Sequence, residues 1–181
     1  GLGAMFTVDG TLNSQMQGDL TLTLKTGETL AGAFGGFSGE GSFTLSLTGP
    51  TSGSIAFDGT LSGVPGVLGS LAVGGSIDSS GDFLFTSAVT SLGLAGFSVQ
   101  SASLTISNTS GVVDVEVDGS MSILGTSFAA SGHLNSAGFG SLAMSLTGST
   151  PSFGGLSGNG SFALNLSSPT SGSVTFNGTL S

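Results

Sequence analysis

The sequence predicts an all-β protein built from tandem repeats, and three observations support this prediction. Gly, Ser and Thr fill 88 of the 181 positions. Hydrophobic and small polar residues alternate in many short runs, and long segments recur along the chain. Successive side chains of a β-strand point to opposite faces, so an alternating run gives a strand with one apolar and one polar face. We find no stretch that combines helical spacing with helix caps.

The repeat is clearest in the second half of each unit. Residues 36–62 and 155–181 are identical at 18 of 27 positions. Residues 96–122 form a more diverged middle copy. All three copies contain the same marker near their end, which reads Gly-Thr-Leu or Gly-Ser-Met. Self-similarity at a fixed period is typical of repeat architectures.

The first half of each unit repeats as well. Residues 2–14 and 124–136 share seven of 13 positions, and residues 68–79 match them once one residue is dropped. The sequence therefore divides into three repeat units of about 60 residues. Because the units end at equivalent positions, we expect them to belong to a longer array. The repeat units are 1–62, 63–122 and 123–181.

Each unit contains four or five alternating runs separated by Gly-, Ser- or Pro-rich breaks. In one run, Asp58-Gly59 is a pair typical of a tight hairpin turn. We predict a continuous strand there instead, because Ile55, Phe57 and Leu61 then share one face. The clearest alternating runs are 20–24, 43–47, 104–106, 113–117, 142–146 and 162–166.

A unit of 60 residues is small for an independent β-sandwich, which takes roughly 100 residues. Repeats of this size bury their apolar face against their neighbours. We therefore predict an elongated β-solenoid or a continuous wound antiparallel sheet. Its ends would expose strand edges, so the expected partners are copies of the same chain, joined end to end or laterally.

Composition excludes several classes of function. The chain has a formal charge of −9 with a single Lys or Arg, which excludes nucleic-acid binding. It has no cysteine, so disulfides and thiol chemistry are absent. No apolar run approaches the length of a transmembrane helix, so we expect no transmembrane segment. Hydrophobic residues make up 38% of the chain, enough to predict a folded protein.

The polar cluster that most clearly indicates a candidate site consists of Asp114, Glu116 and Asp118. On a strand these three side chains share one face, and carboxylate oxygens are the ligands that Ca²⁺ prefers. The cluster therefore predicts either a calcium site or a solvated strand face. Calcium loops gather their ligands in a tight turn, which a straight strand does not provide. His133 stands alone in the sequence, and we expect a structural role for it.

Four asparagines lie in the pattern Asn-x-Ser/Thr, which accepts N-linked sugar in secreted proteins. Such sugars would solvate a surface that has few charges. Ser and Thr fill 54 of 181 positions, so nearly two of the six asparagines should match by chance. The four matching asparagines are Asn108, Asn159, Asn165 and Asn177.

The repeated pattern resembles the Gly/Ser/Thr-rich β-repeats of very large secreted or surface-attached bacterial proteins. It reads S-F-x-L-x-L, then P-T-S-G-S-[IV]-x-F-[DN]-G-T-L-S. The resemblance covers the whole chain. The repeat pattern is similar to those of adhesin stalks and extracellular filament subunits. It implies a structural or adhesive role outside the cell. Some of those families carry Gly- and Asp-rich calcium motifs, which this sequence lacks.

These observations together predict a non-enzymatic structural protein of an extracellular fibre, filament or stalk. Lys25 is the one site for trypsin-like proteases, which suits the extracellular space or the cell surface. We expect no cofactor beyond the calcium considered above. The alternative is a carrier in which the open apolar face of a wound sheet forms a groove for lipid.

Overall fold

The computed structural model describes residues 4–25, 28–123, 125–147, 152–153 and 156–180. None of these residues forms a helix long and apolar enough to cross a membrane. They form strands β1 (Phe6–Leu12), β2 (Gly18–Leu24), β3 (Leu30–Phe34), β4 (Phe37–Gly49), β5 (Ser52–Ser62), β6 (Ser70–Ile77), β7 (Phe83–Leu94), β8 (Phe97–Thr109), β9 (Val112–Ile123), β10 (Thr126–Asn135), β11 (Gly140–Leu146), β12 (Ser152–Phe153), β13 (Leu156–Ser168) and β14 (Ser171–Leu180).

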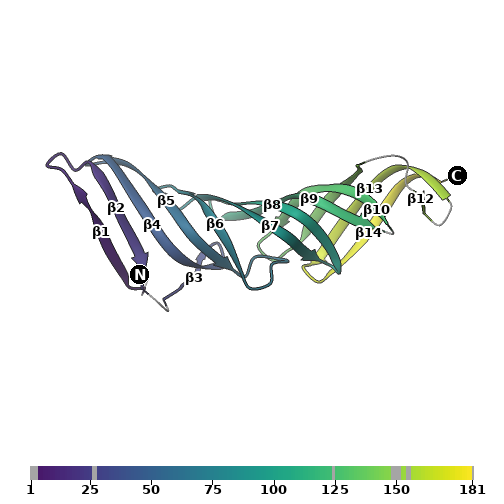
Figure 1. Cartoon of the computed structure of the whole chain (residues 1–181), viewed down its shortest axis with the longest axis horizontal. Coiled ribbons are helices and arrows are strands. Elements are labelled where there is room, and N and C mark those ends of the chain that lie inside the picture. The colour runs from purple at the N-terminus through teal and green to yellow at the C-terminus, as the bar shows by residue number, and fades with distance from the viewer. Residues whose placement is uncertain (1–3, 26–27, 124, 148–151, 154–155, 181) are drawn as a thin grey trace. The chain divides into compact units, whose positions relative to one another are not determined.

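The strands build one open antiparallel sheet in which chain neighbours are sheet neighbours (Figure 1). The order is β1-β2-β4-β5-β6-β7-β8-β9-β10-β11-β13, with β14 on β13; the short strands β3 and β12 pair with β4 and β13. The prediction of an all-β antiparallel sheet is confirmed, and the prediction of a β-solenoid is wrong. Only Pro50 and Thr51 separate β4 from β5. A connection this short returns the chain antiparallel, whereas coiling in one direction needs parallel strands and long crossovers.

The alternating runs predict the strands correctly. Each of the six runs falls within a strand. The continuous strand predicted across Asp58-Gly59 is confirmed, because β5 runs without a turn from Ser52 to Ser62. Within it, Phe57 and Leu61 are buried on one face while Asp58 is exposed on the other.

By proximity in space the residues fall into two compact units, and β7, β8 and β9 contribute to both. This division does not follow the sequence repeats. The first unit holds 1–64, 69–87 and 106–113; the second holds 65–68, 88–105 and 114–181.

In the first unit, β3 covers part of the apolar face of the sheet. β3 pairs with the start of β4, which brings Phe34 across the sheet. The Phe34 ring lies 5.1 Å from the ring of Phe57 and 5.4 Å from that of Phe85, measured between centroids. Leu30, at the other end of β3, is 3% exposed. These four buried residues, three Phe and one Leu, therefore form a small and mainly aromatic core.

In the second unit, backbone hydrogen bonds join turns that are far apart in the sequence. The Ala95 N–H donates to the carbonyl of Pro169 at 2.8 Å, and the Gly93 N–H donates to the carbonyl of Gly66 at 3.0 Å. Ala95 lies between β7 and β8, whereas Pro169 lies between β13 and β14. The sheet within this unit therefore bends back far enough for distant turns to meet. Its buried residues include Leu94, Leu104, Val117, Phe128, Leu134, Leu142 and Leu164.

The first hairpin of each sequence repeat has the same turn. A side-chain oxygen accepts hydrogen bonds from the backbone N–H groups two and four residues further on, at 2.8–3.0 Å, as in an Asx turn. In all three turns, the backbone carbonyl of this residue also accepts a hydrogen bond from the backbone N–H three residues further on. The turn residues are Asn13, Asp78 and Asn135, at equivalent repeat positions.

The same three hairpins share a glycine that lets two backbones come close. A Cβ atom added at Gly10, Gly75 or Gly132 would lie 2.0–2.2 Å from a carbonyl oxygen of the next strand. In each case that carbonyl belongs to the residue nine positions further on. The local geometry of β1–β2, β6–β7 and β10–β11 is therefore one structure repeated three times.

We predict that Gly75→Ala destabilises the protein and that the adjacent change Gly74→Ala does not. A Cβ at Gly75 meets the Leu84 carbonyl oxygen at 2.0 Å, whereas one at Gly74 finds its nearest atom at 3.9 Å. Forcing an atom into a filled space costs about 1–3 kcal/mol. Urea denaturation followed by circular dichroism measures this cost. Equal stability of the two variants would contradict the repeated close approach.

Candidate functional site

The three acidic residues of the predicted calcium site lie on one polar face of β9, as expected. Asp114, Glu116 and Asp118 alternate with Val115 and Val117, which are at most 1% exposed. No group of three His, Cys, Asp or Glu side chains among the described residues could hold a metal ion. Asp114 and Glu116 are half-buried and Asp118 is exposed, and calcium binding there stays a prediction.

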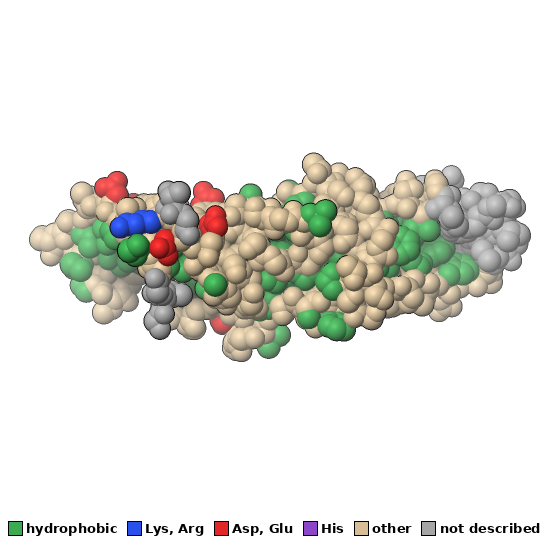
Figure 2. Space-filling view, turned by 90° about the horizontal axis from the view of Figure 1, so that it is seen from below, with side chains coloured by type: hydrophobic (Ala, Val, Ile, Leu, Met, Phe, Trp, Pro, Cys, Tyr) green, Lys and Arg blue, Asp and Glu red, His purple; other side chains and the backbone are tan. Residues whose placement is uncertain are grey.

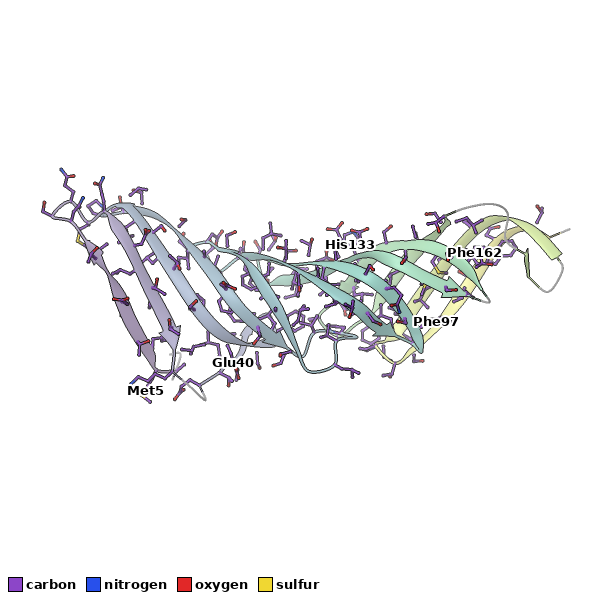
Figure 3. All side chains as sticks on the ribbon, viewed as in Figure 1. Met5, Glu40, Phe97, His133 and Phe162 are labelled. Atoms are coloured by element: carbon purple, nitrogen blue, oxygen red, sulfur yellow. The ribbon has the colours of Figure 1, made fainter. Side chains whose placement is uncertain are left out.

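His133 is the partner of this acidic row. Its Nδ1 atom lies 2.8 Å from Oδ2 of Asp114, and the His133 and Asp114 side chains are 62% and 43% exposed. Figure 3 labels His133 on the ribbon. The hydrogen bond to Asp114 raises the pKa of His133 above its ordinary value of 6.5, and the charges of Asp114, Glu116 and Asp118 raise it further. Sequence patterns do not reveal this pair, because the two residues are 19 positions apart.

Ser141 lies directly opposite His133 on the neighbouring strand β11. Asp114, His133 and Ser141 therefore stand on three adjacent strands, β9, β10 and β11. Nucleophilic catalysis needs the serine hydrogen-bonded to the histidine and donors for the oxyanion. His133 and Ser141 share no hydrogen bond in the described structure, and His133 keeps 62% of its side chain exposed. We therefore regard the three residues as part of the polar face.

The four predicted glycosylation sites differ in their surroundings. Asn165 is exposed and its Nδ2 donates to Thr175 Oγ1 at 3.2 Å, and Asn177 is exposed too. At Asn108, Nδ2 donates to the Gly81 carbonyl at 3.4 Å, and Oδ1 is buried without a partner. The side chain of Asn159 lies outside the described residues. Glycosylation stays a prediction at all four.

Part of the apolar face of the first unit is open. A hollow of about 280 Å³ lies beside β1 and β2, where Leu22, Phe43, Leu45 and Ile55 are only half-buried. Figure 2 shows hydrophobic side chains at the surface on the left, the side of β1 and β2 in Figure 1. The residues lining this hollow are Phe6, Leu22, Leu30, Phe43, Leu45 and Ile55.

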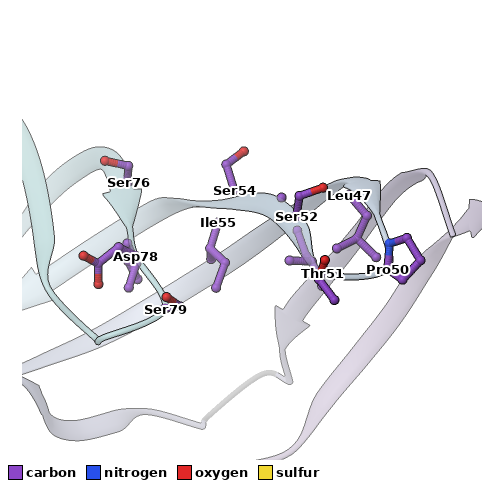
Figure 4. A pocket seen from close by; sticks show the side chains of 12 residues that line it. Leu47, Pro50, Thr51, Ser52, Ser54, Ile55, Ser76, Asp78 and Ser79 are labelled. Carbon is purple, nitrogen blue, oxygen red and sulfur yellow. The ribbon is translucent and has the colours of Figure 1, made fainter.

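A second hollow of about 630 Å³ lies next to the first (Figure 4). Leu45 and Ile55 line both hollows, so the two hollows adjoin. One rim is the β4–β5 turn at Pro50 and Thr51, and the other is the turn that starts at Asp78. Together they form a partly apolar groove, which the open sheet leaves uncovered.

The two outermost strands each have one unpaired side. Among the described residues, β1 pairs only with β2, and β14 pairs only with β13. Edge strands of stable monomers are usually protected by charges, proline or a covering segment. β14 contains neither a charged residue nor proline, and β1 contains a single charge, Asp9. Each edge therefore presents free N–H and carbonyl groups to a further strand.

Comparison of the chain with protein-family models, with curated proteins and with solved structures finds no match.

We predict that the pKa of His133, measured by NMR titration, lies above 6.5 and falls toward it in Asp114→Asn. Because the folded-state pKa is raised, the charged histidine contributes stability that is fully present below pH 6.5. This contribution is lost as the pH rises through the folded-state pKa. Both side chains are well exposed, so the effect on stability is small. An unchanged pKa in Asp114→Asn would contradict the assigned pair.

Proposed function

We propose that this chain is a non-enzymatic structural subunit of an extracellular or cell-surface fibre, filament or stalk. It associates end to end through the edge strands of its sheet. The observation that carries the proposal is that β1 and β14 each have one side on which no described strand pairs. An exposed edge is a template for pairing with another chain, and a soluble monomer normally blocks it.

The exposed apolar side chains of β1 support the same proposal. Val8 in the middle of β1 is 63% exposed, and Met5 just before it is 54% exposed. Val73, at the equivalent repeat position in the interior strand β6, is 4% exposed. The two valines differ in that β6 has a neighbour on both sides whereas β1 has one. A further strand beside β1 would cover this surface.

The composition favours a location outside the cell. Lys25 is the one residue at which a trypsin-like protease can cut. The chain has no Cys, Tyr or Trp, so it offers few targets for oxidation. The exposed strand faces carry mainly Ser and Thr, which solvate the sheet through hydroxyl groups with little charge. These properties suit a durable material in an unprotected environment.

We predict that Val8→Lys prevents polymer formation, because a lysine pointing from an edge strand blocks a further strand. The control is Leu84→Lys on β7. Leu84 is 50% exposed, so the same charge is added at a strand that already has two neighbours. Negative-stain electron microscopy and sedimentation velocity show the outcome. Polymers of Leu84→Lys but not of Val8→Lys are expected, and a parent chain that stays monomeric at high concentration would overturn the proposal.

The open groove of the first unit supports a second candidate, a carrier of an apolar ligand. Its apolar half is lined only by Phe, Leu and Ile side chains, without a polar group that would select a particular head group. A single acyl chain suits such a surface, because burial of apolar area is non-directional. This function does not exclude the first, since the groove and the edges are different surfaces.

We predict for this second candidate that Leu22→Gln weakens binding of a fluorescent fatty acid. Leu22 lines the groove, and a buried unpaired amide is costly. Leu84→Gln on the opposite face of the sheet serves as the control. Equal binding by both variants, or no binding by the parent chain, would exclude the carrier function.

A further inference from the structure

The junction between repeats occurs twice inside the chain with the same geometry. At the first junction β5 pairs antiparallel with β6, and at the second β9 pairs antiparallel with β10. In both, the last strand of one repeat lies beside the first strand of the next. Each junction lies within a single compact unit.

The register is identical at the two junctions. Phe57 lies opposite Gly75 at the first, and the equivalent residues Val117 and Gly132 lie opposite each other at the second. The agreement extends over the whole ladder. The first-junction pairs are Ile55–Ile77, Gly59–Val73 and Leu61–Leu71, and their second-junction equivalents are Val115–Leu134, Gly119–Ala130 and Met121–Phe128.

The two edge strands correspond to the two halves of such a junction. β14 is the last strand of the third repeat and is equivalent to β5 and β9. β1 is the first strand of the first repeat and is equivalent to β6 and β10, with which it shares its turn and its close-approach glycine.

We propose that β14 of one chain pairs antiparallel with β1 of a second copy, in the register of the internal junctions. This inference rests on the proposed function and specifies its contact. The expected cross-chain pairs are Val174–Leu12, Phe176–Gly10, Gly178–Val8 and Leu180–Phe6. The contact is head-to-tail and uses different strands on each partner, so each added copy leaves a free edge strand for the next one.

Side-chain size fits this register. Phe176 meets Gly10, as Phe57 meets Gly75, so the smallest residue again lies opposite a large one. Val8 meets Gly178, as Val73 meets Gly59. Phe176 is only half-buried and Val8 is 63% exposed, whereas Phe57 and Val73 are 1% and 4% exposed. Phe57 and Val73 have a junction partner strand, whereas Phe176 and Val8 have none among the described residues.

Charge fits the register as well. On the polar face, Asp58 lies opposite Gly74 and Asp118 lies opposite Ser131, so neither carboxylate faces a charge. The first strand of the first repeat carries Asp9 at this position. Its expected partner is Asn177, the one member of the series Asp58, Asp118 and Asn177 that is not an acid. Like charges directly opposite each other would destabilise the pair.

Cysteine cross-linking tests the pairing, since the chain has no cysteine of its own. Asp9→Cys and Asn177→Cys chains are mixed under mild oxidation. We expect disulfides between the two variants and none within either one. The double variant Asp118→Cys/Ser131→Cys is the positive control, because these residues form the same pair inside the chain.

The outcomes separate this inference from the proposed function. If polymers form but the disulfides join two Asp9→Cys chains or two Asn177→Cys chains, the head-to-tail pairing is overturned. The proposed structural polymer is then retained. The mixed disulfide without polymers would retain the pairing and remove the polymer function. Monomers without any cross-link would overturn both.

A charge exchange tests the register. Asn177→Asp would face Asp9 of the next chain, and we expect it to weaken association about two- to fivefold at low salt. Asp9→Asn in the same chain should restore association. Thr175→Asp is the matched control, because it adds the same charge opposite Thr11. Equal weakening by both aspartates, or no rescue by Asp9→Asn, would overturn the register.

Discussion

The register of strand pairing is the constraint on which the rest of this structure depends. Side chains alternate along a strand with a period of two, so a slip by one residue would exchange the apolar and polar faces of a whole strand. The chain has few charges to oppose such a slip. Glycines oppose it instead: at Gly10, Gly75 and Gly132 the neighbouring backbone leaves no room for a side chain. The Asx turns fix the same hairpins at their ends.

One open sheet has two faces, and this chain buries its apolar face by two different means. In the first unit a short strand places Phe34 across the sheet. In the second unit the sheet bends until Ala95 and Pro169 meet. The first solution is incomplete, because the apolar surface between Val8 and Ile55 stays partly open. The groove is a consequence of this incomplete cover.

Alternation in the sequence was sufficient to find the strands but not to arrange them. Each predicted run lies in a strand, since a period of two has one structural meaning. The solenoid was wrong because a repeat period carries no information on whether neighbouring strands run parallel or antiparallel. The two-residue connection at Pro50 and Thr51 does indicate the strand direction, because so short a link permits only an antiparallel neighbour.

Features of the site that depend on distant residues could not be predicted. The row Asp114, Glu116 and Asp118 was visible in the sequence, but its partner His133 comes from the next strand. The shared turn at Asn13, Asp78 and Asn135 was missed because two residue types fill it. A position with positive φ is hidden for a similar reason. Ser101 stands where the first repeat has Gly41, and it takes a φ of 50°, which is rare for a residue other than glycine.

Strands that pair side by side have a mechanical consequence. A pull across the strands of the second unit loads the hydrogen-bonded ladders one after another, so resistance is that of the weakest ladder and not the sum. β11 and β13 pair at five positions, whereas β13 and β14 pair at ten. Under such a load we expect the β11–β13 ladder to part before the β13–β14 ladder.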